Sequence, residues 1–225
     1  MRLRVLFASI FLAPAVLAAQ GSASHGADFS LGLTLGTLGI GVEANKLITS
    51  HVGVRAGLNF FNYNTTRDED DLSFDAKIKF KAFTGLVDLY PGARGKFHFT
   101  GGIMTNPVEF TGVGRPSASS TFKIDDVSYT AAQVGTLNSV AKFSSVLPYV
   151  GMGIGTPANS HKGVKIMVDF GVGIGQPTLT LTATGAASNA QLAQSLKNQE
   201  AKTQTDLRKY VKAYPVSTFT IAFAF

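Results

Sequence analysis

The chain has 225 residues, of which 45% are hydrophobic and 15% are charged, whereas about 25% of the residues in an ordinary soluble domain are charged. Cysteine is absent, which excludes both a disulfide framework and a thiolate metal site. The formal net charge of +6 is a mild excess and gives no case for a nucleic-acid partner.

The N-terminal segment has the order of a secretory signal peptide. Arg2 and Arg4 precede an apolar run that starts at Val5, and small residues follow at Ala18 and Ala19. The run is shorter than the roughly 20 residues of a membrane-spanning helix, which disfavours the alternatives of a membrane anchor or a buried helix. We therefore predict a signal peptide at 1–19 and an exported domain at 20–225.

Eight segments of the exported part place an apolar side chain at every second position. This period of two is typical of a β-strand whose two faces differ, and here the second face carries polar side chains or glycine. The segments are 29–35, 40–44, 52–60, 74–82, 97–103, 146–154, 164–174 and 219–225.

The connections between these segments differ in length. Short links are expected near 47–51, 91–95 and 156–163, and long ones at 62–73, 109–139 and 183–213. If both termini lie at one end, all short links fall at that end and the long ones opposite, apart from a tight first hairpin at Gly36 and Thr37. Bacterial outer-membrane barrels have this asymmetry, with short periplasmic turns and long outer loops. The predicted fold is all-β, an eight-stranded antiparallel up-and-down transmembrane β-barrel.

Over residues 28–225 the chain resembles the OmpA-like family of eight-stranded outer-membrane barrels. The most specific element is the last strand, with Phe219, Ile221, Phe223 and Phe225 on one face, which is similar to the signal that the outer-membrane assembly machinery reads in that family. The resemblance implies location in the cell outer membrane as a monomer. It also implies two partners, outer-membrane lipids including lipopolysaccharide and the assembly machinery.

In such a barrel the charged side chains must face the lumen, because each would cost about 2–4 kcal/mol against lipid at the midplane. Glu43 and Arg55 lie on consecutive strands, either as an ion pair or as two independently solvated charges. Asp88 conflicts with the pattern, because it shares the parity of the lipid-facing set. A bulge at Gly85 or a place in the periplasmic headgroup layer would explain it. The charged residues predicted to face the lumen are Glu43, Arg55, Asp75, Lys77, Lys79, Lys81, Lys165 and Asp169.

Two glycine-rich stretches repeat each other, "GMGIGTP" at 151–157 and "GVGIGQP" at 171–177. Their G-x-G-x-G spacing lies within alternating strands and does not fit a phosphate-binding loop, which opens a helix. We expect these inward glycines to leave room for long side chains, so that the lumen is filled.

The last long connection is predicted to contain an amphipathic helix over 188–212. Ser188 and Gln191 have the spacing of a capping box, and apolar residues follow at helical spacing. The helix would either pack over the barrel mouth or contact outer-leaflet phosphates or a partner.

No chemistry-bearing motif stands out. The four histidines are scattered, and none has a serine and an acid at the spacing of a catalytic triad. We therefore predict no catalytic, cofactor-binding or metal-binding residue. The predicted function is a non-catalytic barrel with a structural or loop-mediated role in the cell envelope. The alternatives are a narrow, porin-like channel for small anions, a soluble exported barrel that holds an apolar ligand, and, less favoured, a lipid-modifying enzyme.

Overall fold

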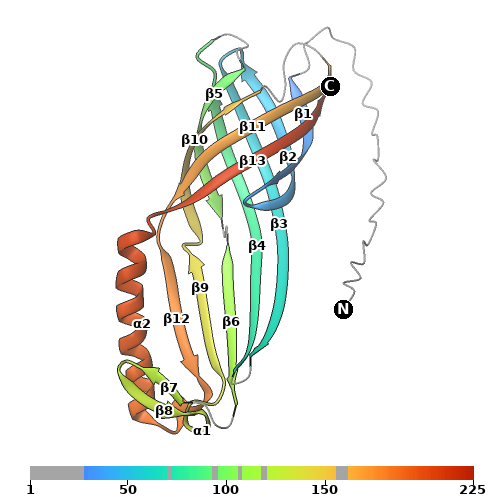
Figure 1. Cartoon of the computed structure of the whole chain (residues 1–225). Helices are drawn as coiled ribbons and strands as arrows, with labels where there is room; N and C mark the ends of the chain where they lie inside the picture. Colours follow the sequence, from blue (N-terminus) through green and yellow to red (C-terminus); the bar gives the residue numbers. More distant parts are fainter. Residues whose placement is uncertain (1–27, 70–71, 93–95, 106–107, 118–120, 156–161) are drawn as a thin grey trace, which may run out of the picture.

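The computed structural model describes residues 28–69, 72–92, 96–105, 108–117, 121–155 and 162–225, so the predicted signal peptide lies outside the described residues. Most of the described chain is antiparallel sheet, with one long helix close to the C-terminus (Figure 1). The elements are β1 (Phe29–Gly36), β2 (Gly39–Thr49), β3 (Val52–Glu69), β4 (Leu72–Leu89), β5 (Phe97–Thr105), β6 (Glu109–Pro116), β7 (Thr121–Ile124), β8 (Val127–Thr130), α1 (Ala131–Val134), β9 (Leu137–Phe143), β10 (Val146–Ile154), β11 (Gly163–Ile174), β12 (Pro177–Ala183), η1 (Thr184–Ala187), α2 (Ala190–Tyr210) and β13 (Ala213–Ala224).

Part of the sheet closes on itself. The pairing runs from β5 through β4, β3, β2 and β1 to β13, and from there through β11 and β10 back to β5. We call this part the ring; it forms the upper half of Figure 1. Closure leaves the ring without a free edge, so its backbone groups are paired all the way round.

The rest of the sheet, which we call the extension, continues from one side of the ring. β3 and β4 are each 18 residues long and run beyond the ring. β4 pairs with β5 over Phe83–Leu89 but with β6 over Leu72–Lys79, and β9 and β12 follow β6 in order. Figure 1 shows these strands below the ring, with α2 beside β12.

The eight segments predicted as strands are the strands that close the ring, but the prediction of long loops at 62–73 and 109–139 is wrong. The sheet has eleven strands, and the stretches at 62–73 and 109–139 contain strands and a small hairpin where loops were expected. Their Asn, Thr and Asp residues are typical of loops. Cross-strand pairing overrides that local preference, because it satisfies the backbone hydrogen bonds along these strands.

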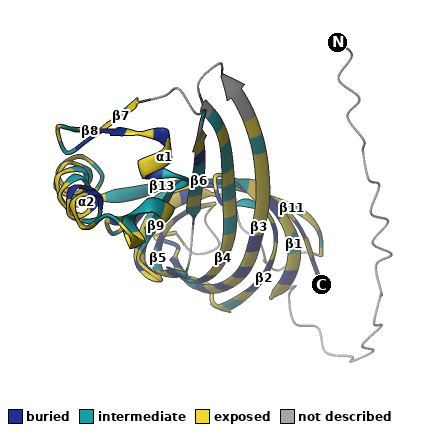
Figure 2. Ribbon diagram, turned by 90° about the horizontal axis from the view of Figure 1, so that it is seen from below, coloured by how far each residue is buried: buried dark blue, intermediate teal, exposed yellow. Residues whose placement is uncertain are grey.

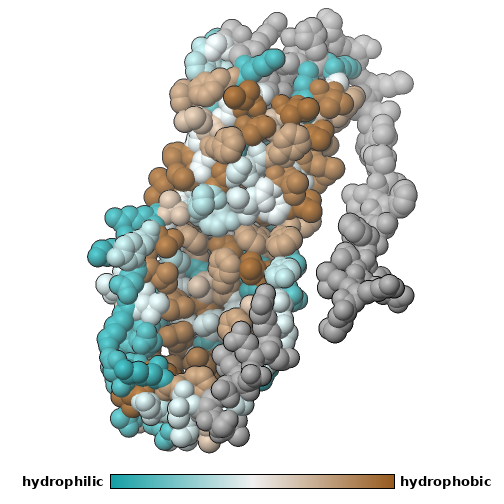
Figure 3. Space-filling model, in the orientation of Figure 1, coloured by the Kyte–Doolittle hydropathy of each residue, from teal (hydrophilic) through white to brown (hydrophobic). Residues whose placement is uncertain are grey.

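The ring carries its apolar side chains on the outside. Leu33, Ile154 and Val164 are 66%, 64% and 68% exposed, although apolar residues of this size are ordinarily buried. Polar residues of the same strands, such as Thr34 and Asn59, are buried. The alternation of buried and exposed residues is visible along the strands in Figure 2, and Figure 3 shows the apolar belt on the upper half of the molecule.

On β4 the predicted faces are reversed. Thr84, Leu86 and Asp88 are buried, whereas Phe83 and Val87 are exposed. The β3–β4 register runs without a shift from Val52–Leu89 to Glu69–Leu72, so there is no bulge at Gly85. The even-numbered residues of β4 therefore face inward throughout. Asp88 therefore has the parity of the inward face, and the prediction that the even residues of β4 face lipid is wrong.

The helix predicted over 188–212 is confirmed as α2. Its N-cap is Asn189, whose side chain accepts a 3.0 Å hydrogen bond from the Leu192 N–H, so the predicted capping box at Ser188 is wrong. Leu192 and Leu196 pack with the β7–β8 hairpin and the end of β12. None of the helices in the described part of the chain is long and apolar enough to cross a membrane.

Two side chains of α2 also protect the free edge of the extension. The N–H groups of Leu179 and Leu181 on β12 donate to Gln204 Oε1 (2.7 Å) and Glu200 Oε2 (2.8 Å). An edge strand with unpaired N–H groups is a site of unwanted strand pairing. The helix therefore takes the place of a further strand.

Candidate functional site

A single arginine lies at the centre of the ring. Arg55 points inward from β3 and is 4% exposed. Its Nε and Nη2 lie 2.7 and 3.0 Å from the two carboxylate oxygens of Asp88 on β4. Its Nη1 and Nη2 lie 3.1 and 3.0 Å from the oxygens of Asp169 on β11. The guanidinium is thus held by a bidentate hydrogen-bonded pair with Asp169 and by a close ion pair with Asp88, to which Nη2 donates a hydrogen bond.

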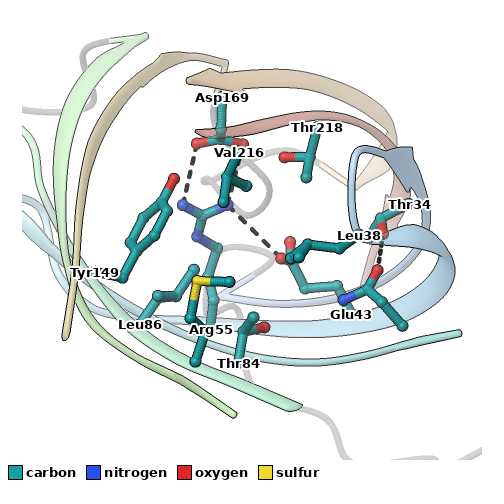
Figure 4. Close-up of a pocket in the computed structure, with 12 residues that line it drawn as sticks. Thr34, Leu38, Glu43, Arg55, Thr84, Leu86, Tyr149, Asp169, Val216 and Thr218 are labelled. Carbon is teal, nitrogen blue, oxygen red and sulfur yellow. Dashed lines mark hydrogen bonds and ion pairs between the residues drawn. The ribbon is translucent and has the colours of Figure 1, made fainter. Parts of the chain in front are cut away.

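Residues on two further strands, β2 and β5, complete what we call the arginine network, and Figure 4 shows Arg55 with its partners Glu43 and Asp169. Glu43 on β2 approaches Arg55 Nη1 at 3.7 Å, a longer contact than those of the two aspartates. Thr100 on β5 donates a 2.7 Å hydrogen bond to Asp88 Oδ1, and His98 Nε2 lies 2.7 Å from Asp169 Oδ1. The network therefore joins five strands of the ring through their inward side chains.

The network carries an excess of negative charge. One guanidinium faces three carboxylates, and His98 is the only other basic side chain among the described residues in contact with them. Buried charges are costly unless each has partners, and removal of one partner leaves the others uncompensated. Arg55 is thus the residue on which the charge balance of the interior depends.

The free space beside the network is small. A cavity of about 20 Å³ adjoins Arg55, Glu43 and Tyr149, which is room for about one water molecule. Toward the extension the interior is apolar and packed. Its buried residues come from the β1–β2 turn and from β4, β5, β10 and β13. This apolar layer consists of Leu38, Ala82, Leu86, Met104, Leu147, Tyr149 and Val216. The interior of the ring is thus filled by two layers, the arginine network and, on the side of the extension, the apolar layer.

The inward glycines have the role expected for them. A Cβ atom at Gly171 would collide with the Tyr149 hydroxyl, and one at Gly173 would lie 2.6 Å from Met104 Sδ. At Gly153 the added atom would lie 2.6 Å from His98 Nε2. These glycines leave the space that the larger interior side chains occupy.

The structure brings together only some of the residues predicted to face the lumen. Glu43, Arg55 and Asp169 are buried in the network, and Lys165 is partly buried on the inward face of β11. The ion pair of Glu43 and Arg55 exists, but it is the weakest contact of the guanidinium. The prediction missed Asp88 and Thr100, and the anomalous parity of Asp88 was the available signal.

The prediction is wrong for the charged residues of β4. Lys77, Lys79 and Lys81 have the parity of the exposed Phe83 and are themselves exposed. Asp75 shares that face and forms a 2.6 Å ion pair with Arg115 on β6. Hydrogen bonds from Thr66 and Arg115 lower the pKa of the Asp75 carboxyl. These residues lie in the extension, where the polar face of the sheet points outward and the apolar face inward.

The arrangement links strands of the ring through buried ion pairs and hydrogen bonds. Within the described residues no group of three or more histidine and carboxylate side chains is placed to hold a metal ion. The His98–Asp169 pair lies inside the filled ring, next to a cavity that holds no more than about one water. The four outward residues of the last strand, by contrast, are 41–52% exposed on the apolar belt.

Comparison with known proteins shows the fold alone. No protein-family model and no curated protein matches the sequence, so the resemblance to the OmpA-like family is not confirmed. The crystal structure of Acinetobacter baumannii CarO2 aligns with a TM-score of 0.55 and 16% identity, covering 88% of this chain and 98% of that chain. The structure of CarO from the same organism aligns with a TM-score of 0.52 and 17% identity, covering 87% and 97% of the two chains. The chain therefore shares the overall fold of these proteins.

Proposed function

We propose that the chain is an integral β-barrel of the cell outer membrane that has no catalytic activity and supports or presents contacts at the cell envelope. The observation that carries the proposal is a closed ring with apolar side chains outside and a charged network inside. In water this surface would expose a large apolar belt. In lipid the same belt is favourable, and closure satisfies every backbone group.

The proposed orientation follows from the two ends of the ring. The described termini and the β2–β3 turn lie at one end of the ring, and the extension lies at the other (Figure 1). Outer-membrane barrels have short turns on the periplasmic side and longer segments outside. The extension would then be a rigid platform of strands and helix at the cell surface, able to present its faces to lipid, matrix or partner proteins.

The two main alternatives lose support. The anion channel was inferred from lysines in the lumen, but Lys77, Lys79 and Lys81 lie on the outer face of the extension. The soluble barrel with an apolar ligand requires the apolar face of the ring to point inward, whereas the large apolar side chains of the ring are exposed.

The decisive experiment is fractionation of cells that express the full chain, followed by gel electrophoresis with and without boiling. We expect the protein in the outer-membrane fraction, with a shift in mobility when boiling unfolds the closed barrel. Recovery in the soluble periplasmic fraction without a heat-dependent shift would contradict the proposal.

We expect the purified protein to conduct no ions in a planar lipid bilayer. The physical reason is the filled interior, in which the arginine network and the apolar layer leave a cavity of only about 20 Å³. A porin reconstituted by the same procedure serves as the positive control. Reproducible current steps of several hundred picosiemens from the pure protein would restore the channel alternative.

Phe225 is expected to matter for assembly more than for the finished barrel. In the structure its N–H donates to the Phe29 carbonyl (3.0 Å), and its ring lies 5.6 Å from that of Phe29. The change Phe225→Asp should lower the yield in the outer membrane several-fold while refolding in detergent stays nearly unchanged. Ile154→Asp, at an exposed position of the apolar belt on β10, is the control outside the last strand. Equal losses in both assays would mean that Phe225 acts only through the fold.

A further inference from the structure

Three exposed lysines lie close together at the boundary between the ring and the extension. Lys79 and Lys81 lie on β4 and Lys142 lies on β9, and all three are exposed. They line a cavity of about 390 Å³ that opens to the surface. The other described residues that line it are Val108, Glu109, Phe143 and Ser145.

The register of the sheet explains why these side chains share one face. Lys79 pairs with Glu109 on β6, and Glu109 pairs with Lys142 on β9, so the three residues form one row across neighbouring strands. Residues directly opposite each other in a sheet project to the same side. Lys81 stands between this row and the ring, two residues from Lys79 on the same face of β4.

The row lies just beyond the apolar belt. Phe83, two residues from Lys81 on the same face, is 43% exposed and belongs to the belt together with Ile103 and Val146. Two residues of a strand span about 7 Å, so the Lys81 and Lys79 backbones lie about 7 and 14 Å from that of Phe83. In the proposed orientation this is the depth of the outer-leaflet headgroups.

The charge at this site is unbalanced. Three ammonium groups surround one carboxylate, and among the described residues none of the three lysines forms an ion pair. A cationic pocket at headgroup depth is suited to a phosphate group of an anionic lipid.

We propose that Lys79, Lys81 and Lys142 bind the phosphate of an outer-leaflet lipid whose acyl chains lie along the apolar belt at Phe83, Ile103 and Val146. The inference rests on the proposed function, and it adds a defined lipid site on one side of the barrel. Lysine suits the role because its apolar stem can follow the belt while its ammonium group reaches the headgroup layer. Glu109 lies between Lys79 and Lys142 in the same row of the sheet.

The test measures lipid binding by the full-length barrel in detergent, using bisphosphorylated lipid A, dephosphorylated lipid A and inorganic pyrophosphate as probes. The variant Lys79→Gln/Lys81→Gln/Lys142→Gln is compared with Lys46→Gln/Lys96→Gln/Lys162→Gln. The control removes the same charge from exposed lysines at the opposite end of the ring. Every variant is first checked for the heat-dependent gel shift, and Lys142→Gln alone replaces the triple variant if that variant does not fold.

We expect the triple variant to bind bisphosphorylated lipid A at least about tenfold more weakly than the wild type, since each lysine contributes to attraction at a membrane surface. The control should stay within about twofold, and Lys142→Gln alone should lose about threefold. Dephosphorylated lipid A should bind equally weakly to all variants and to the wild type.

An unchanged affinity of the triple variant for bisphosphorylated lipid A, or an equal loss in the control, would overturn the site. Pyrophosphate binding as tight as that of lipid A would replace the lipid with a soluble phosphate. Because the gel shift and fractionation are independent of lipid affinity, failure of the site is distinguishable from failure of the proposed function.

Discussion

Replacement of Arg55 by methionine is expected to lower the free energy of unfolding by about 3–5 kcal/mol. The substitution removes the cation that pairs with all three carboxylates and leaves Asp88, Asp169 and Glu43 buried together without their main partner. Methionine keeps a similar length, so packing is disturbed less than charge. The measurement is reversible urea unfolding of the protein in lipid vesicles. The folded fraction at each urea concentration is read from the heat-dependent gel shift.

A second arginine provides the control for this prediction. Arg115 forms a 2.6 Å ion pair with Asp75, but its side chain is 55% exposed in the extension. Arg115→Met should cost no more than about 1 kcal/mol, since exposed ion pairs contribute little.

A double-mutant cycle isolates the buried contact. Asp169→Asn should be less costly in the Arg55→Met background than in the wild type, because residues in one ion-pair network are not additive. Equal costs at Arg55 and Arg115, or strict additivity in the cycle, would show that the network contributes no special stability.

The change Leu33→Arg tests whether the belt meets lipid. Leu33 lies near the middle of β1, paired with Val42 and Ile221 on the two neighbouring strands, and is 66% exposed. A charged side chain on the lipid face is expected to destabilise the barrel by about 2–4 kcal/mol at the midplane. If the belt faced water, the same substitution would change the stability by no more than about 0.5 kcal/mol.

The matched control is Thr180→Arg, an exposed position on the polar face of β12 in the extension. We expect this variant to unfold with the wild-type free energy, within about 0.5 kcal/mol. Both variants are refolded into vesicles and into detergent, so that the penalty can be compared between bilayer and micelle. A neutral Leu33→Arg in vesicles would contradict the membrane barrel, whatever the result of the conductance measurement.

The sequence was sufficient for the ring because alternation is a local property. In Phe29–Leu35 or Val164–Ile174 every second residue is apolar, and this fixes both the strand and its two faces without knowledge of a partner. The helix α2 was predictable for the same reason, since its apolar spacing is local. Its cap was not, because Ser188 and Asn189 are both good N-cap residues.

The faces of β4 could not be read in the same way. From Phe74 to Phe80 the even residues are apolar, like the outward residues of the other ring strands, but here they face the inside of the extension. The strand keeps the same face outward over its whole length. Because it leaves the ring partway, Phe83 on that face lies in the apolar belt, whereas Lys79 on the same face lies in the extension. Only the identity of the neighbouring strand, β5 or β6, distinguishes these two environments.

The sequence by itself determined that the chain alternates into strands, that it carries an apolar face too large for an ordinary soluble domain, and that a helix precedes the last strand. Tertiary structure alone decided that β4 changes partner, that three further strands extend the sheet, and that Arg55, Asp88, Asp169 and His98 meet. These last residues lie up to 114 positions apart in sequence. Their contact depends on which strands close the ring and in which register, and both are set by pairing between distant segments, not by the pattern within any one of them.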